Sequence, residues 1–328
     1  MTSPARWRRF LRYDPIAPLL RSNDALRYFV RRDLLEENVG PLDTLWGLPE
    51  VLKLIKRQRK NGSWKYHGGK KHIRSRANYD QLETYRILGQ LAEKYGLTRK
   101  HQAIERAADF LFSFQTTEGD FRGIYAQQYS PNYSAGIMEL LIKAGFAEDA
   151  RIEQGLQWLL SMRQDAGGWI IPIRSRRDST LKLLRLRTPV QPDRSLPFSH
   201  LATGVVLRAF AAHPRYRKRA DVKDAGELLK SRFFKPDKYP DRRTASFWTK
   251  IRYPFWFTDI LSALDSLWWL GFSVNDVHIA EGVEWLVLHQ QNTGLWKASY
   301  EMKDREIDLW TSLAVCRVLK RFTEAQPR

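Results

Sequence analysis

Apolar residues recur every three to four positions along most of the chain, which is the spacing of amphipathic α-helices. Segments with this spacing lie near residues 23–37, 48–59, 79–95, 99–115, 130–145, 149–164, 198–212, 217–233, 256–270, 275–291 and 307–322. Asn23 and Ser130 stand at N-cap positions, the second before Pro131, and Gly145 and Gly271 suit left-handed helix ends. The pattern predicts an all-α protein.

These segments are of two kinds. RIEQGLQWLLSMRQ has a charged face, whereas YSAGIMELLIKAGF and LWTSLAVCRVL are apolar almost all round. The first kind suits an outer helix and the second an inner one. The start of the chain, with Trp7, Phe10 and Leu11 among arginines, is either a packed outer helix or a basic helix lying on an anionic membrane. With the packed alternative, six inner and six outer helices close a ring.

A short pattern of Gln, Gly and an aromatic residue follows several of the outer segments. We call these the marker segments, and they are Gln58-Gly62-Trp64, Gln115-Gly119-Phe121, Gln164-Gly167-Trp169 and Gln290-Gly294-Trp296. Successive glutamines lie roughly 50 to 60 residues apart, with one gap of about double that length, in which a degenerate copy is expected near 232–248. Gln can bond free backbone groups at a helix end, Gly permits a turn, and the aromatic ring packs on the next repeat. We therefore expect a structural role.

The marker segments resemble the QW repeats of the terpenoid cyclase and protein prenyltransferase superfamily. The resemblance covers nearly the whole chain, although Phe121 replaces Trp and the Gln164 copy is one residue shorter. The opening DPIAPLLRSNDALRYFVRRDLL and the length are most similar to small bacterial or archaeal squalene-cyclase-like proteins of unassigned reaction. The resemblance implies an α/α toroid over residues 1–328, with an isoprenoid or another lipid as ligand.

Composition adds limits to this interpretation. The chain has 328 residues, a net charge of +19 and twelve Trp, so it can build a sizeable aromatic interior and attract anions. No stretch approaches the about 18 apolar residues of a membrane span, and the first residues lack the apolar run of a signal peptide. We expect a cytoplasmic protein, with peripheral membrane contact as an open alternative.

Basic residues cluster in the connections that follow the marker segments. All such connections should lie at the end of the ring where the inner helices begin, and helix N-termini add partial positive charge there. Two of them, near 170–197 and 235–255, are long enough to act as lids. The sequence therefore predicts an anion-binding rim that includes Lys70, Lys71, Arg74, Arg76, Arg174, Arg176 and Arg177.

Below this rim, the first turns of the inner helices are expected to place aromatic and acidic side chains near a central cavity. The candidate ligand-binding residues are Tyr79, Tyr133, His200, Trp256 and Trp310, and the candidate catalytic acids are Asp259, Asp80 and Asp308. Aromatic walls suit a hydrocarbon chain or a cation formed from it. Ordinary core packing and helix capping are the alternative roles. Asp259 is the first choice as acid, because burial beside Phe255-Trp256-Phe257 would raise its pKa while the helix N-terminus would lower it.

The sequence lacks the catalytic motifs that are known in the superfamily it resembles. There are no adjacent aspartates, so neither the Asp-x-Asp-Asp acid motif nor an aspartate-rich magnesium motif is present. The lone Cys316 has no Asp two residues before it, so the zinc motif of protein prenyltransferases is missing too, and we expect no metal or other cofactor. The sequence identifies neither a reaction nor an oligomeric state.

Three functions remain open from the sequence. The first is a lipid- or isoprenoid-binding toroid with an anionic head group on the rim, acting as a cyclase or prenyl-transfer-type enzyme with non-standard catalytic residues. The second is a non-catalytic module that uses the basic rim to bind nucleic acid, an anionic membrane or an acidic protein. The third is a toroid acting on acidic saccharides through two carboxylates.

Overall fold

The computed structural model describes residues 6–68, 79–176, 178–239, 243–299 and 306–324. In this part of the chain every regular element is a helix, apart from two isolated β-bridges. The all-α prediction is confirmed. No described helix is long and apolar enough to cross a membrane.

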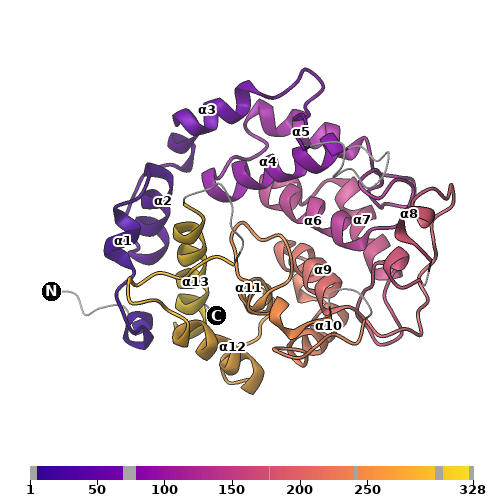
Figure 1. Ribbon diagram of the computed structural model, residues 1–328. Helices are drawn as coiled ribbons and strands as arrows, with labels where there is room; N and C mark the ends of the chain where they lie inside the picture. Colours follow the sequence, from indigo (N-terminus) through magenta and orange to yellow (C-terminus); the bar gives the residue numbers. More distant parts are fainter. Residues whose placement is uncertain (1–5, 69–78, 177, 240–242, 300–305, 325–328) are drawn as a thin grey trace.

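Six inner helices form a closed ring in the described part of the chain (Figure 1). They are α2 (Asp24–Phe29) with its π-helical continuation η2 (Val30–Leu34), α4 (Tyr79–Tyr95), α6 (Pro131–Leu141) with η5 (Ile142–Phe146), α9 (His200–Ala212), α11 (Ile260–Trp269) and α13 (Ile307–Thr323). Each contacts the next in this order, and α13 contacts α2 to close the ring. The predicted inner set is therefore correct, with boundaries shifted by a few residues.

Outer helices pack around this inner ring. The outer set is the 3-10 helix η1 (Arg6–Phe10), α3 (Pro49–Lys56), α5 (Gln102–Phe112), α7 (Ala150–Ser161), α10 (Ala220–Lys230) and α12 (Val277–Leu288). The N-terminal segment packs against α13 with Trp7 fully buried, as expected for the packed alternative. Short helical turns fill the connections: α1 (Ile16–Leu20), η3 (Leu42–Gly47), η6 (Pro172–Arg174), α8 (Thr180–Leu183), η7 (Tyr216–Lys218) and η8 (Ala245–Phe247).

Most of the predicted helix-end signals act as expected. The Asn23 side chain accepts a hydrogen bond from the Leu26 amide at 2.8 Å, and Gly145 and Gly271 have φ values of 97° and 86°. Ser130 stands at the N-cap position of α6, but its side chain makes no capping hydrogen bond and instead contacts Asn132. The predicted N-cap position of Ser130 before Pro131 is therefore confirmed, without a side-chain capping bond.

In the marker segments, the Gln side chain joins one repeat to the next. Gln58 Nε2 donates to the Gly62 carbonyl at 2.9 Å, within its own loop, and to the Ala103 carbonyl at 2.8 Å, at the start of the following outer helix. Gln290 repeats this with Gly294 and Tyr13, which links the last outer helix to the N-terminal segment. Because Gln290 and Tyr13 lie at opposite ends of the chain, this copy closes the ring.

The glycine of the marker segment is required by a close backbone approach. Gly62 has a φ of 86°, and a Cβ atom added there would lie 2.0 Å from the Arg106 carbonyl oxygen of α5. A side chain at this position would push the outer helix away.

The aromatic residue of the marker segment is anchored at two atoms. The Trp296 amide donates to Ser312 Oγ of α13 at 2.8 Å, and its indole Nε1 donates to the Leu286 carbonyl at 2.6 Å. Trp169 makes equivalent bonds to Thr203 and Leu159, although its copy is one residue shorter. The predicted structural role of these residues is thus visible in their contacts.

Candidate functional site

The segment Arg252–Phe257, between α10 and α11, crosses the interior of the ring. The Tyr253 amide donates to Thr311 Oγ1 of α13 at 3.1 Å, and the Tyr253 hydroxyl donates to the Glu93 carboxylate of α4. From α9, Arg208 Nη1 donates to the Phe257 carbonyl at 3.2 Å. The segment is thereby held to helices on different sides of the ring, and Figure 1 shows this orange connection within the space that the inner helices enclose.

Two cavities of about 590 Å³ each lie on the two sides of this segment. The aromatic cavity is lined by Tyr85, Arg86, Gly89, Leu140 and Ile307 and by all of Arg252–Phe257. The arginine cavity is lined by Phe29, Arg32, Ala92, Trp268, Trp269, Arg317 and Arg321, near the C-terminal ends of the inner helices. Glu93, Tyr253 and Phe255 line both, so the crossing segment separates them.

The aromatic cavity is walled by rings from α4 and from the crossing segment. The Tyr85 and Trp256 rings lie 5.1 Å apart, and the Arg86 guanidinium lies 5.1 Å above the Trp256 ring. Burial raises the pKa of Tyr85 to about 12, so its hydroxyl stays neutral at all physiological pH values. Gly136 leaves room for this hydroxyl, because a Cβ atom there would lie 2.5 Å from it.

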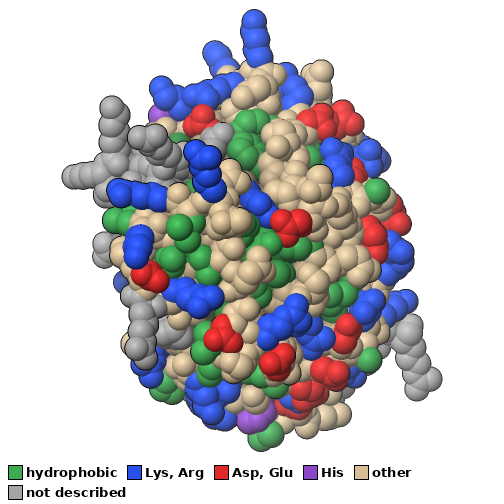
Figure 2. Space-filling view, turned by 90° about the vertical axis from the view of Figure 1, so that its right-hand side faces the viewer, with side chains coloured by type: hydrophobic (Ala, Val, Ile, Leu, Met, Phe, Trp, Pro, Cys, Tyr) green, Lys and Arg blue, Asp and Glu red, His purple; other side chains and the backbone are tan. Residues whose placement is uncertain are grey.

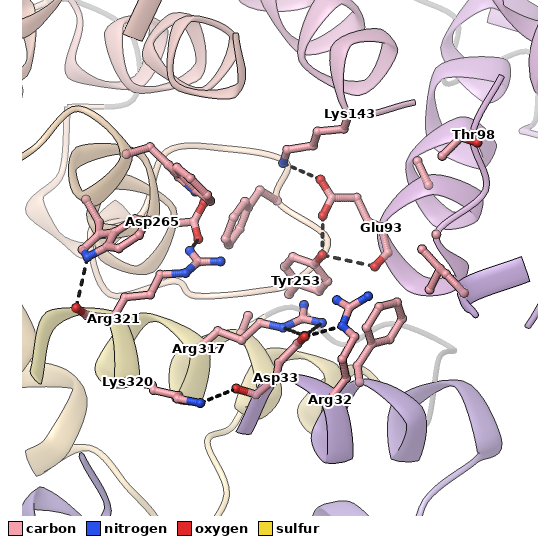
Figure 3. Close-up of a pocket in the computed structure, with 18 of the residues that line it drawn as sticks. Arg32, Asp33, Glu93, Thr98, Lys143, Tyr253, Asp265, Arg317, Lys320 and Arg321 are labelled. Carbon is pink, nitrogen blue, oxygen red and sulfur yellow. Dashed lines mark hydrogen bonds and ion pairs between the residues drawn. The ribbon is translucent and has the colours of Figure 1, made fainter. Parts of the chain in front are cut away.

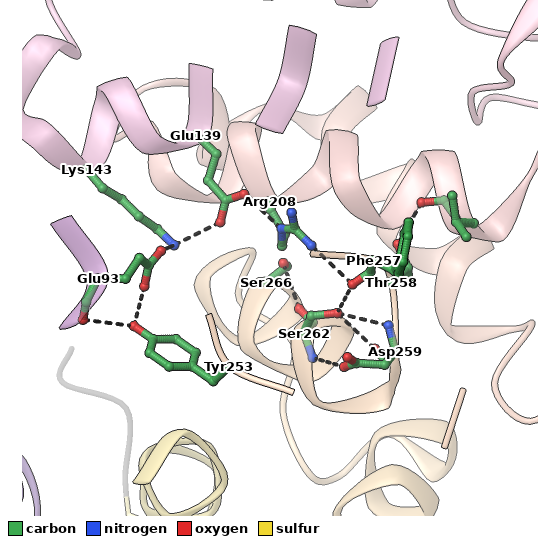
Figure 4. A network of polar contacts seen from close by, with 11 residues as sticks. Glu93, Glu139, Lys143, Arg208, Tyr253, Phe257, Thr258, Asp259, Ser262 and Ser266 are labelled. Carbon is green, nitrogen blue, oxygen red and sulfur yellow. Dashed lines mark hydrogen bonds and ion pairs between the residues drawn. The ribbon is translucent and has the colours of Figure 1, made fainter. Parts of the chain in front are cut away.

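A chain of charged side chains joins the two cavities (Figure 4), and Lys143 is its one partly exposed member. Lys143 Nζ donates to Glu93 at 2.6 Å and to Glu139 at 2.8 Å, and Arg208 Nε donates to Glu139 at 2.8 Å. Burial would raise the pKa of Glu139, but the positive charges of Arg208 and Lys143 outweigh it and hold the pKa below the ordinary value. Glu139 is therefore ionised and does not act as a proton donor at neutral pH.

Asp259, the preferred candidate acid, is the N-cap of α11. Its Oδ1 accepts from the Ser262 amide at 2.8 Å, and Ser262 Oγ accepts from the Asp259 amide in a reciprocal capping box. Oδ2 makes no hydrogen bond with a described residue. Burial raises the pKa of Asp259 to about 7, against the lowering effects of Ser262, Arg208 and the Arg252 amide. Asp259 lines neither large cavity and lies two residues after Phe257, the last residue of the crossing segment that lines one (Figure 4).

The other two candidate acids hold the connections that follow marker segments. Asp80 accepts from the Tyr66 amide at 2.8 Å and pairs with Arg59 at 2.7 Å. Asp308 accepts from the Ala298 amide at 2.8 Å. Each carboxylate thus accepts a hydrogen bond from the backbone amide that lies two residues after a marker Trp. Neither Asp80 nor Asp308 lines a large cavity.

Of the predicted aromatic residues, Trp256 lines a large cavity and the others pack elsewhere. Tyr79 packs on Tyr66 and Tyr133 on Tyr125. Trp310 is fully buried against Phe29. His200 stacks on Trp248 with ring centroids 4.6 Å apart, and burial and Arg232 lower its pKa to about 4, so it is neutral. These four residues form core contacts in the described structure.

The predicted basic rim is only partly described. Lys70, Lys71, Arg74, Arg76 and Arg177 lie outside the described residues. Arg174 lies 6.0 Å from the Tyr125 ring centroid, and exposed Arg176 donates to the Gln191 carbonyl at 3.5 Å. Figure 2, which faces the side of the ring near α8, shows Lys and Arg side chains interspersed with Asp and Glu. On that face the described charges do not gather into one basic surface.

The charged residues in and beside the cavities were not predicted from the sequence, although a signal for two of them was present. Glu139 interrupts the apolar run YSAGIMELLIKAGF, and Arg208 interrupts HLATGVVLRAFAA. A charged residue inside a helix that is apolar all round must find a partner of opposite charge. Reading the two interruptions together would have predicted the Glu139–Arg208 pair between α6 and α9.

Among the described residues no group of three or more His, Cys, Asp and Glu side chains is placed to hold a metal ion.

Comparison with known proteins identifies no family. No protein-family pattern and no curated protein sequence matches the chain. Solved structures with a similar helix arrangement include type II terpene cyclase MstE from Scytonema, which is 14% identical with a TM-score of 0.47 over 94% of this chain and 98% of that one. A protein from Actinoplanes is 15% identical with a TM-score of 0.44 over 92% and 99% of the two chains.

A third similar structure is the polysaccharide lyase BACCELL_00875, which is 12% identical with a TM-score of 0.44 over 85% of each chain. Similarities this weak assign neither a substrate nor a reaction.

Proposed function

We propose that this protein binds an isoprenoid or another lipid-like molecule inside its ring, as squalene-cyclase-like proteins would, with the apolar part in the aromatic cavity. The observation that carries this proposal is the wall of that cavity. Rings of Tyr85, Tyr253, Phe255, Trp256 and Phe257 surround a volume of about 590 Å³, within the range of small-molecule sites. Such a wall favours hydrocarbon and also stabilises a cation formed from it.

Gly89 supports the presence of a functional space in this position. It lies in the middle of α4, where Gly costs about 1 kcal/mol relative to Ala. A Cβ atom there would lie 3.2 Å from Leu140 Cδ1, and both residues line the aromatic cavity. Gly89 therefore lets α4 lie close to Leu140 of α6 at the wall of this cavity, and a much larger side chain there would have to displace Leu140 or enter the cavity.

If the bound molecule reacts, an acid-initiated reaction needs a proton donor near the aromatic cavity. We propose Asp259 for this role, because a pKa of about 7 leaves about half of it protonated at neutral pH. Its carboxyl group lies behind the crossing segment, so proton transfer to a ligand requires this segment to shift. Asp259→Asn should then abolish turnover while leaving ligand affinity unchanged, whereas retained turnover would remove Asp259 from the mechanism.

We expect neutral geranylgeraniol to bind the wild-type protein, and we expect Gly89→Phe to weaken this binding about tenfold or more. The added ring would occupy the aromatic cavity and displace the ligand. Binding is measured by titration with the tryptophan fluorescence as signal.

Ala92→Phe is the matched control, because Ala92 lies three residues along the same helix and lines the arginine cavity instead. It should change the affinity by less than about twofold. The proposal fails if the wild type does not bind, or if the two variants lose affinity equally while both keep the wild-type melting temperature.

A further inference from the structure

The arginine cavity lies across the crossing segment from the aromatic cavity, and it was not predicted from the sequence. It is formed near the C-terminal ends of η2, α4, α11 and α13, together with Tyr253 and Phe255. Figure 3 shows Arg317 and Arg321 reaching from α13 toward the Tyr253 ring, with Glu93 and Lys143 beyond it. The anion-binding rim was predicted where the inner helices begin, so this cavity lies at a different place from that prediction.

One carboxylate and one ring fix two guanidinium groups of this cavity. Arg317 pairs with Asp33 at 2.6 Å and Arg32 Nε donates to Asp33 at 2.6 Å. Both guanidinium groups also lie over the Phe29 ring, at 4.9 and 4.8 Å. Burial would raise the pKa of Asp33, but the two arginines outweigh it and keep the pKa below its ordinary value. Two positive charges thus share one negative charge at this wall.

Arg321 is held in a similar way on the opposite part of the lining. Its Nη1 donates to Asp265 at 2.5 Å, and its guanidinium lies 5.4 Å from the Trp268 ring and 5.3 Å from the Trp269 ring. Because Arg317 and Arg321 are four residues apart, they project from the same face of α13. The side chains are already ordered, so a ligand would not have to immobilise them.

Each of these arginines keeps N–H groups that bond no described residue. Arg32 retains both Nη atoms, Arg317 retains Nη1, and Arg321 retains Nε and Nη2. A guanidinium carries five donors in a planar fork, which suits two oxygens of a carboxylate or phosphate. The cavity therefore contains arginine N–H groups that are held in place but donate no hydrogen bond to a described residue.

The positive charge continues onto the surface beyond Trp268 and Trp269. A groove of about 400 Å³ is lined by these two residues and by Arg217, Lys218, Arg219 and Lys223. Arg217 lies 5.0 Å from the Trp269 ring, and Arg217, Lys218 and Lys223 form no ion pair with a described carboxylate. An anion that approaches this end of the ring is attracted before it reaches the cavity.

We infer that the arginine cavity binds an organic anion, in which a carboxylate or phosphate lies on the free N–H groups of Arg32, Arg317 and Arg321 and an apolar body packs against Leu97, Phe255 and Trp268. This site is separate from the proposed isoprenoid site and does not depend on it. The same cavity supplies the charged donors and the apolar wall, so a ligand with both parts should bind much better than either part alone.

The test compares four small probes by isothermal titration calorimetry, below the concentrations at which they form micelles. The probes are decyl phosphate, decanoate, neutral decanol and inorganic phosphate. Decyl phosphate, decanoate or both should bind at least about tenfold more tightly than decanol and inorganic phosphate, and the affinity should fall as sodium chloride is raised. The phosphate and carboxylate arms show which head group the site prefers.

Variants locate the site. Arg32→Gln combined with Arg321→Gln should weaken decyl phosphate binding about tenfold or more, because two charged donors are lost while Arg317 still neutralises Asp33. Arg174→Gln combined with Arg176→Gln removes the same charge from the predicted rim and should have less than about a twofold effect. Ala92→Phe should block binding and Gly89→Phe should not.

Three results would overturn the inference. Equal affinity for decanol and decyl phosphate would mean that no anion is recognised. Equal losses in the two double variants would mean that only net charge matters. Loss in Gly89→Phe with full retention in Ala92→Phe would place the anion in the aromatic cavity. Because geranylgeraniol binding is measured separately, the proposed function and this inference can fail independently.

Discussion

Trp296→Ala is expected to lower the free energy of unfolding by about 3–5 kcal/mol, the range for large buried aromatic residues. Trp296 is 1% exposed, and its two nitrogen atoms bond Leu286 of α12 and Ser312 of α13. The truncation leaves a cavity between an inner and an outer helix. It also removes the indole N–H that donates a hydrogen bond to the Leu286 carbonyl. Trp169→Ala should cost about as much, because its contacts with Leu159 and Thr203 are equivalent.

Trp269→Ala is the matched control for this prediction. Trp269 is 39% exposed and lies at the end of α11, so its truncation should cost no more than about 1 kcal/mol. Chemical unfolding followed by circular dichroism measures all three variants. Equal midpoints for Trp296→Ala and Trp269→Ala would contradict the structural role of the marker segments.

Asp259→Asn is expected to become more stable relative to the wild type as the pH rises from about 4 to about 8, by up to about 4 kcal/mol. The Asp259 carboxyl has a pKa of about 7 in the folded protein, against an ordinary value of 3.8. Between these values the folded protein holds a proton that the unfolded chain has lost, so wild-type stability falls as the pH rises through this window. Asn does not titrate and caps a helix about as well as Asp.

Asp276→Asn provides a control of opposite sign. Asp276 is the N-cap of α12, and although burial would raise its pKa, Lys230 and the backbone amides hold the pKa below its ordinary value. Its contribution is present at neutral pH and is lost as the pH falls, so this variant should lose stability relative to the wild type as the pH rises. Parallel stability curves for Asp259→Asn and the wild type would show that Asp259 is not buried as a neutral acid.

The ring could be predicted from the sequence because its signals are local and repeated. The period of the apolar residues located the helices, and the marker segments identified the junctions, since Gly62 and Trp296 each make contacts that only those residue types can make. The Gln164 copy shows that the aromatic contact tolerates a changed spacing. There Arg163 Nε donates to the Gly167 carbonyl, the bond that Gln58 makes to Gly62 in the full pattern.

The structural role of two candidate acids was also present in the sequence as a repeat. Asp80 precedes Thr84 by four residues, and Asp308 precedes Ser312 by the same spacing. In both cases the Thr or Ser hydroxyl accepts a hydrogen bond from the backbone amide of a marker Trp. The Asp carboxylate accepts a hydrogen bond from the backbone amide two residues after that Trp. An Asp followed four residues later by Thr or Ser, recurring after marker segments, indicates a structural role. This spacing would have shown that Asp80 and Asp308 differ in role from Asp259.

The cavities could not be predicted, because they depend on one irregular segment and on contacts between residues far apart in the chain. The Tyr253 hydroxyl reaches Glu93, and Arg317 reaches Asp33, across separations of 160 and 284 residues. No local period specifies that Arg252–Phe257 crosses the ring rather than covering its end. The sequence therefore indicated an aromatic interior but not its division into two spaces.

Photo-crosslinking examines the claim that a lipid-like molecule binds in the aromatic cavity, because it marks the residues that the molecule touches. A diazirine analogue of geranylgeraniol is irradiated with the protein, and the labelled peptides are mapped by mass spectrometry. We predict labels within Arg252–Phe257 and within Glu83–Gln90, two of the stretches that line this cavity, and their loss when unlabelled geranylgeraniol is added. Labels confined to exposed residues such as Leu52 or Val277, or labels that the competitor does not reduce, would contradict the claim.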